Sequence, residues 1–204
     1  STDNSSGKTN IIENSDLMKM ALESLQGKWG LAIGTILVYI LVVGIIQIIP
    51  FLGVIAGLII AGPMALGMAI FILSLSRNQE AKLEQLFNGF SNFGTSLGAY
   101  LLIALFTLLW MLLLIIPGII AAISYSLTFY IIADDNSIGA MDAIDKSKKM
   151  MDGFKWKYFC LCLRFIGWAL LCILTLGIGF LWLIPYMQVS FAKFYENIKA
   201  YQLT

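Results

Sequence analysis

Two neighbouring carboxylates, Asp134 and Asp135, have the spacing needed to hold a divalent cation, and Asp142 and Asp145 follow within about three helical turns. Paired acids at a membrane surface could bind Mg²⁺ and support phosphoalcohol chemistry. The same acids also precede a predicted helix that begins near Ile138, where negative charge favours the helix N-terminus. A membrane enzyme acting on lipid phosphates is therefore one hypothesis, and helix stabilisation is the other.

A group of basic residues offers a different chemistry, the binding of phosphate in lipid headgroups or of an acidic partner protein. Arg164 lies inside an otherwise apolar segment, where it could extend to the headgroups, pair with Asp134, Asp135 or Glu196, or bind a substrate. The predicted headgroup- or partner-binding residues are Lys146, Lys148, Lys149, Lys155, Lys157 and Arg164.

The residue types that usually carry catalysis are scarce. The chain has no histidine, the commonest general base near neutral pH. Its three cysteines, Cys160, Cys162 and Cys172, lie in one apolar segment and favour neither a disulfide framework nor a zinc site. No nucleotide-binding loop or nucleophile motif occurs. We therefore predict a protein that is not an enzyme, without catalytic residues, cofactor or bound metal.

The elements that must position these residues are membrane helices. The chain is 59% hydrophobic and 12% charged, against about 25% charged in soluble domains. Three stretches lack any charge, at 29–76, 85–133 and 165–192. At about 20 residues per membrane crossing, the first two stretches are each long enough for two spans. The third is long enough for two spans only if flanking residues are included. We predict an all-α polytopic bundle with spans at 29–49, 51–74, 93–116, 118–133, 158–174 and 177–195.

The six predicted spans form three hairpins, at about 29–74, 93–133 and 158–195, within one domain covering 15–204. The fourth and fifth spans are short, so a re-entrant hairpin is an alternative. All 13 lysines and arginines fall outside the three hairpins' turns. By the positive-inside rule, both termini and both long loops lie in the cytoplasm, in a bacterial inner membrane. Residues 1–14 are predicted to be a disordered tail. The net charge of +1 gives no reason to expect nucleic acid.

A weak repeat precedes the hairpins. Gly27, Gly89 and Gly153 occupy matching places, each followed by an aromatic residue at the start of an odd-numbered span. Glycine is a usual helix stop. The polar segments before these glycines, at 15–26, 80–90 and 138–151, have apolar residues at helical spacing and predict amphipathic helices at the cytoplasmic surface. They could lie among the headgroups or cap the bundle from below, and the sequence favours neither.

Small residues and prolines shape the predicted spans. Prolines inside even-numbered spans remove backbone hydrogen bonds and could line a polar cavity. The residues proposed for this lining are Pro63, Pro185, Tyr186 and Gln188. Three GxxxG pairs suit close helix packing and a homo-oligomer interface. These pairs are Gly30/Gly34, Gly53/Gly57 and Gly94/Gly98.

Several motifs in the second half of the chain resemble a bacterial membrane family catalogued as domain of unknown function nine-seven-five. They are FIGW at 165–168, TLGIGFLWLIPY at 175–186 and FY at 194–195, with Ser147 and Met150 loosely placed against Gly153 and a weaker LQGKWG match near the N-terminus. The resemblance covers roughly 17–195. The family is distantly similar to the membrane domain of some glycerophosphodiester phosphodiesterases, and it implies no established activity.

The sequence thus favours a non-catalytic membrane module that binds membrane lipids, through their headgroups, or a membrane-protein partner by its basic cytoplasmic face. The alternative is a small transporter, exporter or tolerance factor for an amphipathic peptide or lipid. The kinked even-numbered spans and the repeat motivate this second hypothesis.

Overall fold

The computed structural model describes residues 11–47 and 52–202, and within these ranges the regular structure is entirely helical. The all-α prediction is therefore confirmed. The predicted tail at 1–10 lies outside the described residues. The helices are α1 (Asn14–Leu25), α2 (Trp29–Gln47), α3 (Leu52–Ser76), the 3₁₀ helix η1 (Leu83–Asn92), α4 (Phe93–Leu113), α5 (Ile115–Tyr125), α6 (Thr128–Asp134), α7 (Ala140–Met150), α8 (Lys155–Leu174) and α9 (Phe180–Gln202).

Five helical segments are long and apolar enough to cross a membrane. They are Trp29–Gln47, Ile55–Ser76, Leu83–Leu112, Ile115–Asp134 and Lys155–Leu174. The predicted sixth span, at 177–195, overlaps α9 from Phe180 onward. This helix is not among the five, and polar residues such as Lys193, Glu196 and Lys199 lie in its second half. The fold is that of a multi-pass helical protein, and the count of six is not confirmed.

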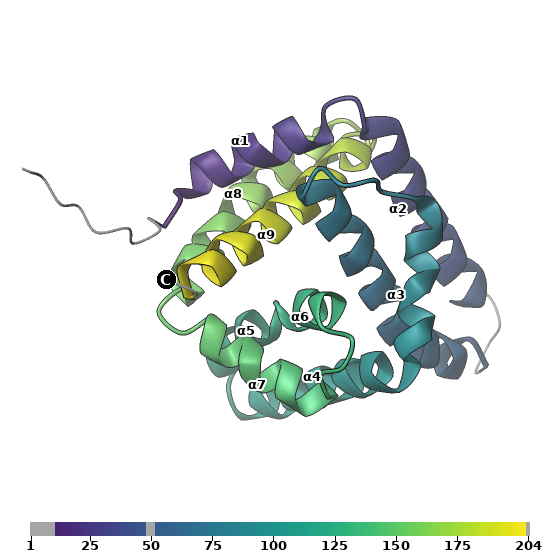
Figure 1. The fold of residues 1–204 in the computed structure, drawn as a ribbon, viewed down its shortest axis with the longest axis vertical. Helices are drawn as coiled ribbons and strands as arrows, with labels where there is room; N and C mark the ends of the chain where they lie inside the picture. Colours follow the sequence, from purple (N-terminus) through teal and green to yellow (C-terminus); the bar gives the residue numbers. More distant parts are fainter. Residues whose placement is uncertain (1–10, 48–51, 203–204) are drawn as a thin grey trace, which may run out of the picture.

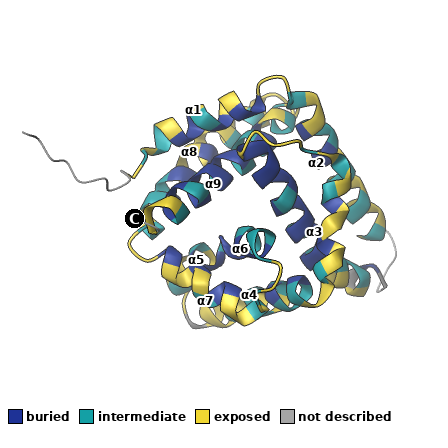
Figure 2. Ribbon diagram, viewed as in Figure 1, coloured by how far each residue is buried: buried dark blue, intermediate teal, exposed yellow. Residues whose placement is uncertain are grey.

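The even-numbered predicted spans lie at the centre of the fold and the odd-numbered ones lie outside. Two-thirds (67%) of the most apolar window in Ile55–Ser76 is buried, against 17% in Trp29–Gln47 and 11% in Leu83–Leu112. In Figure 1, α1, α8 and α9 form one side of the molecule, α2 and α3 a second, and α4, α5 and α7 a third. Figure 2 shows buried residues concentrated on α3, α6 and α9. The exposed apolar surface of the outer helices is suited to contact with lipid tails.

Two of the predicted glycines lie in the short turns between a polar helix and the apolar helix that follows it. Gly27 and Gly153 have φ angles of +73° and +77°, a left-handed conformation that only glycine adopts without strain. Each glycine follows the end of one helix, and the next helix begins two residues after the glycine. Trp29 is the first residue of α2, and Phe93 is the first residue of α4, as the sequence predicted.

Two of the three predicted amphipathic segments form α-helices that pack onto the bundle. On α1, Leu17, Ala21 and Leu25 are fully buried against a core that includes α9. On α7, Ala143 and Ile144 are fully buried, and the helix packs on α4, α5 and α6. Between the two alternatives left open by the sequence, these contacts favour helices that cap the bundle, because their apolar faces meet protein.

The third amphipathic segment behaves differently. It forms η1, which lies along α3 and continues into α4. A Cβ atom on Gly67 would lie 1.8 Å from the carbonyl oxygen of Leu86, and one on Gly89 would lie 1.9 Å from that of Pro63. The prediction that Gly89 stops a helix is therefore wrong. Its missing side chain instead allows the two backbones to touch.

We expect Gly67→Ala to lower the free energy of unfolding by about 1–3 kcal/mol, because the new methyl group overlaps the backbone of η1. Gly34→Ala is the matched control in another apolar helix, since nothing lies within 4 Å of its added Cβ. Alanine's better helix propensity should stabilise the control by up to about 1 kcal/mol. Denaturant unfolding in detergent micelles measures both, and equal effects would contradict the close packing of η1 on α3.

Candidate functional site

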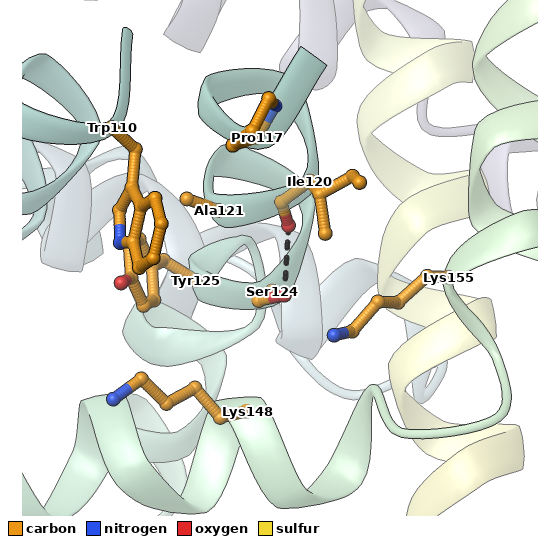
Figure 3. Close-up of a pocket in the computed structure, with 8 residues that line it drawn as sticks. All are labelled: Trp110, Pro117, Ile120, Ala121, Ser124, Tyr125, Lys148 and Lys155. Carbon is orange, nitrogen blue, oxygen red and sulfur yellow. Dashed lines mark hydrogen bonds between the residues drawn. The ribbon is translucent and has the colours of Figure 1, made fainter. Parts of the chain in front are cut away.

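A pocket of about 340 Å³ lies between the α4–α5 hairpin and the turn that joins α7 to α8 (Figure 3). It combines a mainly apolar wall with two of the lysines predicted to bind headgroups. Its lining residues are Trp110, Pro117, Ile120, Ala121, Ser124, Tyr125, Lys148 and Lys155.

Close packing holds the apolar wall in place. Leu114 is extended between α4 and α5, so α5 folds back along α4. Gly118 contributes to this approach, because a Cβ atom there would lie 2.4 Å from Cγ of Met111. Trp110 and Pro117, near the ends of the two helices, are thus brought to one side of the pocket.

A chain of serine hydrogen bonds places Lys148. The Ser124 hydroxyl donates to the carbonyl of Ile120 at 2.7 Å, within α5. The Ser147 hydroxyl donates to the carbonyl of Ser124, also at 2.7 Å, and so joins α7 to α5. Both serines are buried, which makes the bond between the two helices costly to lose. Lys148 follows Ser147 directly and therefore lies at the pocket's edge.

The Lys148 ammonium group lies 5.8 Å from the centroid of the Tyr125 ring, close enough for a cation–π interaction. It also forms an ion pair with Asp145 at 3.0 Å. Tyr125 is only 5% exposed and packs against Phe106, with ring centroids 6.2 Å apart. Lys148 and Asp145 are both about half exposed, so their ion pair is accessible to solvent and contributes little to stability.

Lys155 completes the polar end of the pocket. It is the first residue of α8, two residues after the left-handed Gly153. Figure 3 shows its side chain directed toward Ser124. Lys155 makes no ion pair with a described residue. An anion in the pocket would meet this ammonium group and the adjacent N-terminus of α8, whose dipole also favours negative charge.

The remaining predicted basic residues lie elsewhere. Lys146 and Lys149 are exposed on α7. Lys157 donates a hydrogen bond to the carbonyl of Ile12 and thereby ties the start of the described chain to α8. Arg164 is exposed on α8 and pairs with no described residue; the expected partners Asp134 and Glu196 bind Arg77 instead.

Arg77 connects the C-terminal ends of α3 and α6 to the C-terminal third of α9. Its terminal nitrogens hold Asp134 at the end of α6 bidentately, at 2.7 and 2.9 Å, and its Nε donates to Glu196 of α9 at 2.9 Å. Asp134 also accepts hydrogen bonds from Lys199 at 2.5 Å and from the Tyr195 hydroxyl at 2.8 Å. We call these five residues the Asp134 cluster. The hydrogen bonds to Asp134 raise the pKa of Arg77 further above its usual range.

The Asp134 cluster extends to α1. The Ser76 hydroxyl donates to Glu196 at 2.9 Å, while its carbonyl accepts from Lys193 and, at 3.4 Å, from Ser24 of α1. Sequence reasoning did not find this arrangement, although the signal was present: Arg77, Asp134 and Glu196 each lie at or just beyond the end of an even-numbered span. Because Arg77 is opposite in charge to Asp134 and Glu196 and all three occupy equivalent positions, a contact between them could have been predicted from the sequence.

The two neighbouring aspartates separate in the structure. Asp135 is exposed and accepts hydrogen bonds from the backbone and hydroxyl of Ser137, at 3.0 and 2.5 Å. These bonds lower its pKa. Because Asp134 is paired with Arg77, the two carboxylates do not share a ligand. Within 11–47 and 52–202, no group of three or more acidic or cysteine side chains is placed to hold a metal.

The predicted cavity residues are only partly brought together. Gln188 lines a central cavity of about 220 Å³ together with Ala65, close in sequence to Pro63. The Pro63 carbonyl packs against Gly89, and Tyr186 packs edge-on against Phe165. Pro185 is buried within α9. Among the GxxxG pairs, Gly53 and Gly57 contact α2 of the same hairpin, whereas added Cβ atoms on Gly30 and Gly34 would meet nothing within 4 Å.

Comparison with known proteins gives one match. The model of the DUF975 family, described as a protein of unknown function, matches residues 12–128 and 110–202. No curated protein and no solved structure matches the chain.

We expect Asp134→Asn to lower the free energy of unfolding by about 1.5–3 kcal/mol, because Arg77 loses its charged bidentate partner. Asp135→Asn removes the same charge one residue away, from an exposed carboxylate, and should leave stability nearly unchanged. Unfolding of both variants in the same detergent measures the difference. Equal losses, or Mg²⁺-dependent stabilisation abolished by either variant, would instead favour a shared cation site.

Proposed function

The chain belongs to the DUF975 family, whose function is unknown, and from that premise we propose that it is a non-catalytic membrane module that binds the headgroups of anionic lipids. The observation that carries the proposal is the pocket of Figure 3, where Lys148 and Lys155 flank an apolar wall. A phosphate group would bind the Lys155 ammonium group, which points toward Ser124, while the Lys148 ammonium group lies on the other side of the pocket beside the Tyr125 ring (Figure 3). An acyl chain would follow the wall toward Trp110 and Pro117.

Two features support a lipid over a soluble anion. Trp110 and Ile120 are about half exposed in the pocket wall, and the neighbouring residues Leu112, Ile115 and Ile116 are largely exposed. Such a surface is stable only against hydrocarbon or another apolar surface. Lysines beside an apolar surface are the usual arrangement at a membrane interface, where their stems pack on hydrocarbon and their charges reach phosphate.

The proposal includes the topology expected from the sequence. In it, α9 completes a third hairpin with α8, so that six spans place both termini on the cytoplasmic side of a bacterial inner membrane. The Asp134 cluster supports this topology, because it joins the C-terminal ends of α3 and α6 to the C-terminal third of α9, which must then lie on the same side. The matching glycine conformations at Gly27 and Gly153 support a repeated hairpin unit.

Site-directed labelling tests this topology. In a cysteine-free background, Ser137→Cys should react with a membrane-impermeant thiol reagent only from the cytoplasmic side. Ile178→Cys, in the exposed turn between α8 and α9, should react only from the opposite side. Labelling of both positions from the same side would show that the third hairpin does not cross, in favour of a re-entrant arrangement.

Lipid binding is tested by a pair of double variants with the same change in net charge. We expect Lys148→Gln/Lys155→Gln to reduce the phosphatidylglycerol retained by the protein roughly thirtyfold, since each lysine at an anionic surface is worth about 1 kcal/mol. Native mass spectrometry after extraction from vesicles of phosphatidylglycerol and phosphatidylcholine measures the retained lipid.

Lys146→Gln/Lys149→Gln is the control, because both lysines are exposed on the same helix and neither lines the pocket. It should cause a much smaller loss. Equal losses from the two double variants would mean that binding follows surface charge and would overturn the pocket as the site.

A further inference from the structure

Arg164 places a charge in the middle of an apolar helix. It lies halfway along α8, which is long and apolar enough to cross a membrane. In the five such segments of the described chain, every other charged residue is among the first or last three residues of its segment. Arg164 is about 13 Å along the helix from Lys155, close to half of the roughly 30 Å hydrocarbon core. A charge at that depth is costly unless a partner meets it.

The described part of the chain offers Arg164 no such partner. The residue is exposed, and its guanidinium group makes no ion pair or hydrogen bond with another described residue. The two acids expected beside it, Asp134 and Glu196, are both held by Arg77. The five N–H donors of the arginine side chain are therefore left for a group outside the described structure.

Arg164 belongs to a face of α8 that its own chain leaves uncovered. The opposite side of the helix packs on α9 through the rings of Tyr158 and Phe165. The uncovered residues follow one another at spacings of four, three and four, so they align along the helix. We call them the Arg164 face: Cys160, Arg164, Gly167 and Leu171. A Cβ atom on Gly167 would meet nothing within 4 Å.

The Arg164 face has the features of a surface that packs on another helix. Small residues lie on both sides of the arginine, and such residues allow two backbones to approach closely in a membrane. Lipid tails can cover Leu171, but hydrocarbon cannot satisfy a guanidinium group. An arginine that only reached up to a lipid phosphate would need no small residue one turn deeper in the helix, where Gly167 lies.

A second copy of this chain cannot supply the missing carboxylate. The charge-free stretches at 29–76, 85–133 and 165–192 contain no acid, so no span of a copy carries one away from its ends. Symmetric packing of two α8 helices would instead bring two Arg164 side chains together, and like charges repel strongly where the dielectric constant is low. The partner must be a different protein.

We propose that the Arg164 face binds a transmembrane helix of another membrane protein, one with an Asp or Glu near the middle of its span. The guanidinium group would donate two hydrogen bonds to this carboxylate, in the bidentate form that Arg77 makes with Asp134. Gly167 would admit the partner's backbone. The proposal requires that α8 crosses the membrane, and it is otherwise independent of lipid binding at the lysine pocket.

The first test uses a synthetic helix of about 20 leucines and alanines with one central aspartate. Fluorescence energy transfer measures its association with the full chain in phosphatidylcholine vesicles. We expect a dissociation constant about tenfold lower than for the same peptide with a central asparagine, because charged hydrogen bonds are stronger. Arg164→Gln should remove this preference. Lys149→Gln, which removes the same charge from an exposed site on α7, should keep it.

Gly167→Leu tests the close approach of the partner helix. The larger side chain should weaken binding of the aspartate peptide about tenfold, since the two backbones are held apart. Gly44→Leu is the matched control, because Gly44 is exposed on α2 and an added Cβ atom there would also meet nothing within 4 Å. Binding should be unchanged in this control. Equal losses in the two variants would contradict the Arg164 face as the contact.

Stability and lipid measurements exclude the other roles of the arginine. Arg164→Gln should leave both the melting temperature in detergent and the retained phosphatidylglycerol unchanged. A lower melting temperature would show that Arg164 pairs within its own chain, and a loss of phosphatidylglycerol would assign it to a lipid phosphate; either result would overturn the proposal. Lipid binding by Lys148→Gln/Lys155→Gln is measured separately, so the two proposals can fail independently.

Cross-linking in intact cells tests whether a natural partner occupies this face. A benzophenone amino acid at Leu171 should form a product with a protein that has an acid in the middle of a span. The product should disappear with Arg164→Gln and return when Arg164→Glu is combined with an arginine in place of the partner's acid. Cross-links only to lipid or to a second copy of this chain would overturn the proposal.

Discussion

The bidentate pair between Arg77 and Asp134 is the constraint that organises the molecule. Its two residues follow one central helix and end another, and Glu196 brings the third central helix to the same guanidinium. The Asp134 side chain is only 12% exposed, so its charge requires the partners it has. Helices in a bilayer gain little from apolar contact with each other, because lipid is equally apolar. Charged hydrogen bonds therefore help to hold these helices together, a role that burial of apolar side chains has in a soluble protein.

The contacts of Arg77 with Asp134 and Glu196 hold α3, α6 and α9 together. This association determines which helix surfaces remain on the outside of the protein. The central helices bury the halves that carry their polar residues. The outer helices α2, α4 and α8 expose leucine and isoleucine side chains. The amphipathic helices then cover the polar half: α1 lies over α9, and α7 lies against α4 and α6. The polar residues are thus packed together within the protein, and the exposed surface of the outer helices is largely apolar.

The sequence by itself determined the all-helical class, the presence of several apolar helices long enough to cross a membrane, and the start of α2 at Trp29. These follow from local composition, because a run without charges and a glycine at a left-handed turn act on neighbouring residues only. Tertiary structure alone decided that Asp134 binds Arg77 while Asp135 does not, and that Gly89 packs against Pro63 and does not end a helix. Each of these depends on the rotation of one helix against another, and uniformly apolar helices carry little periodic signal that would define it.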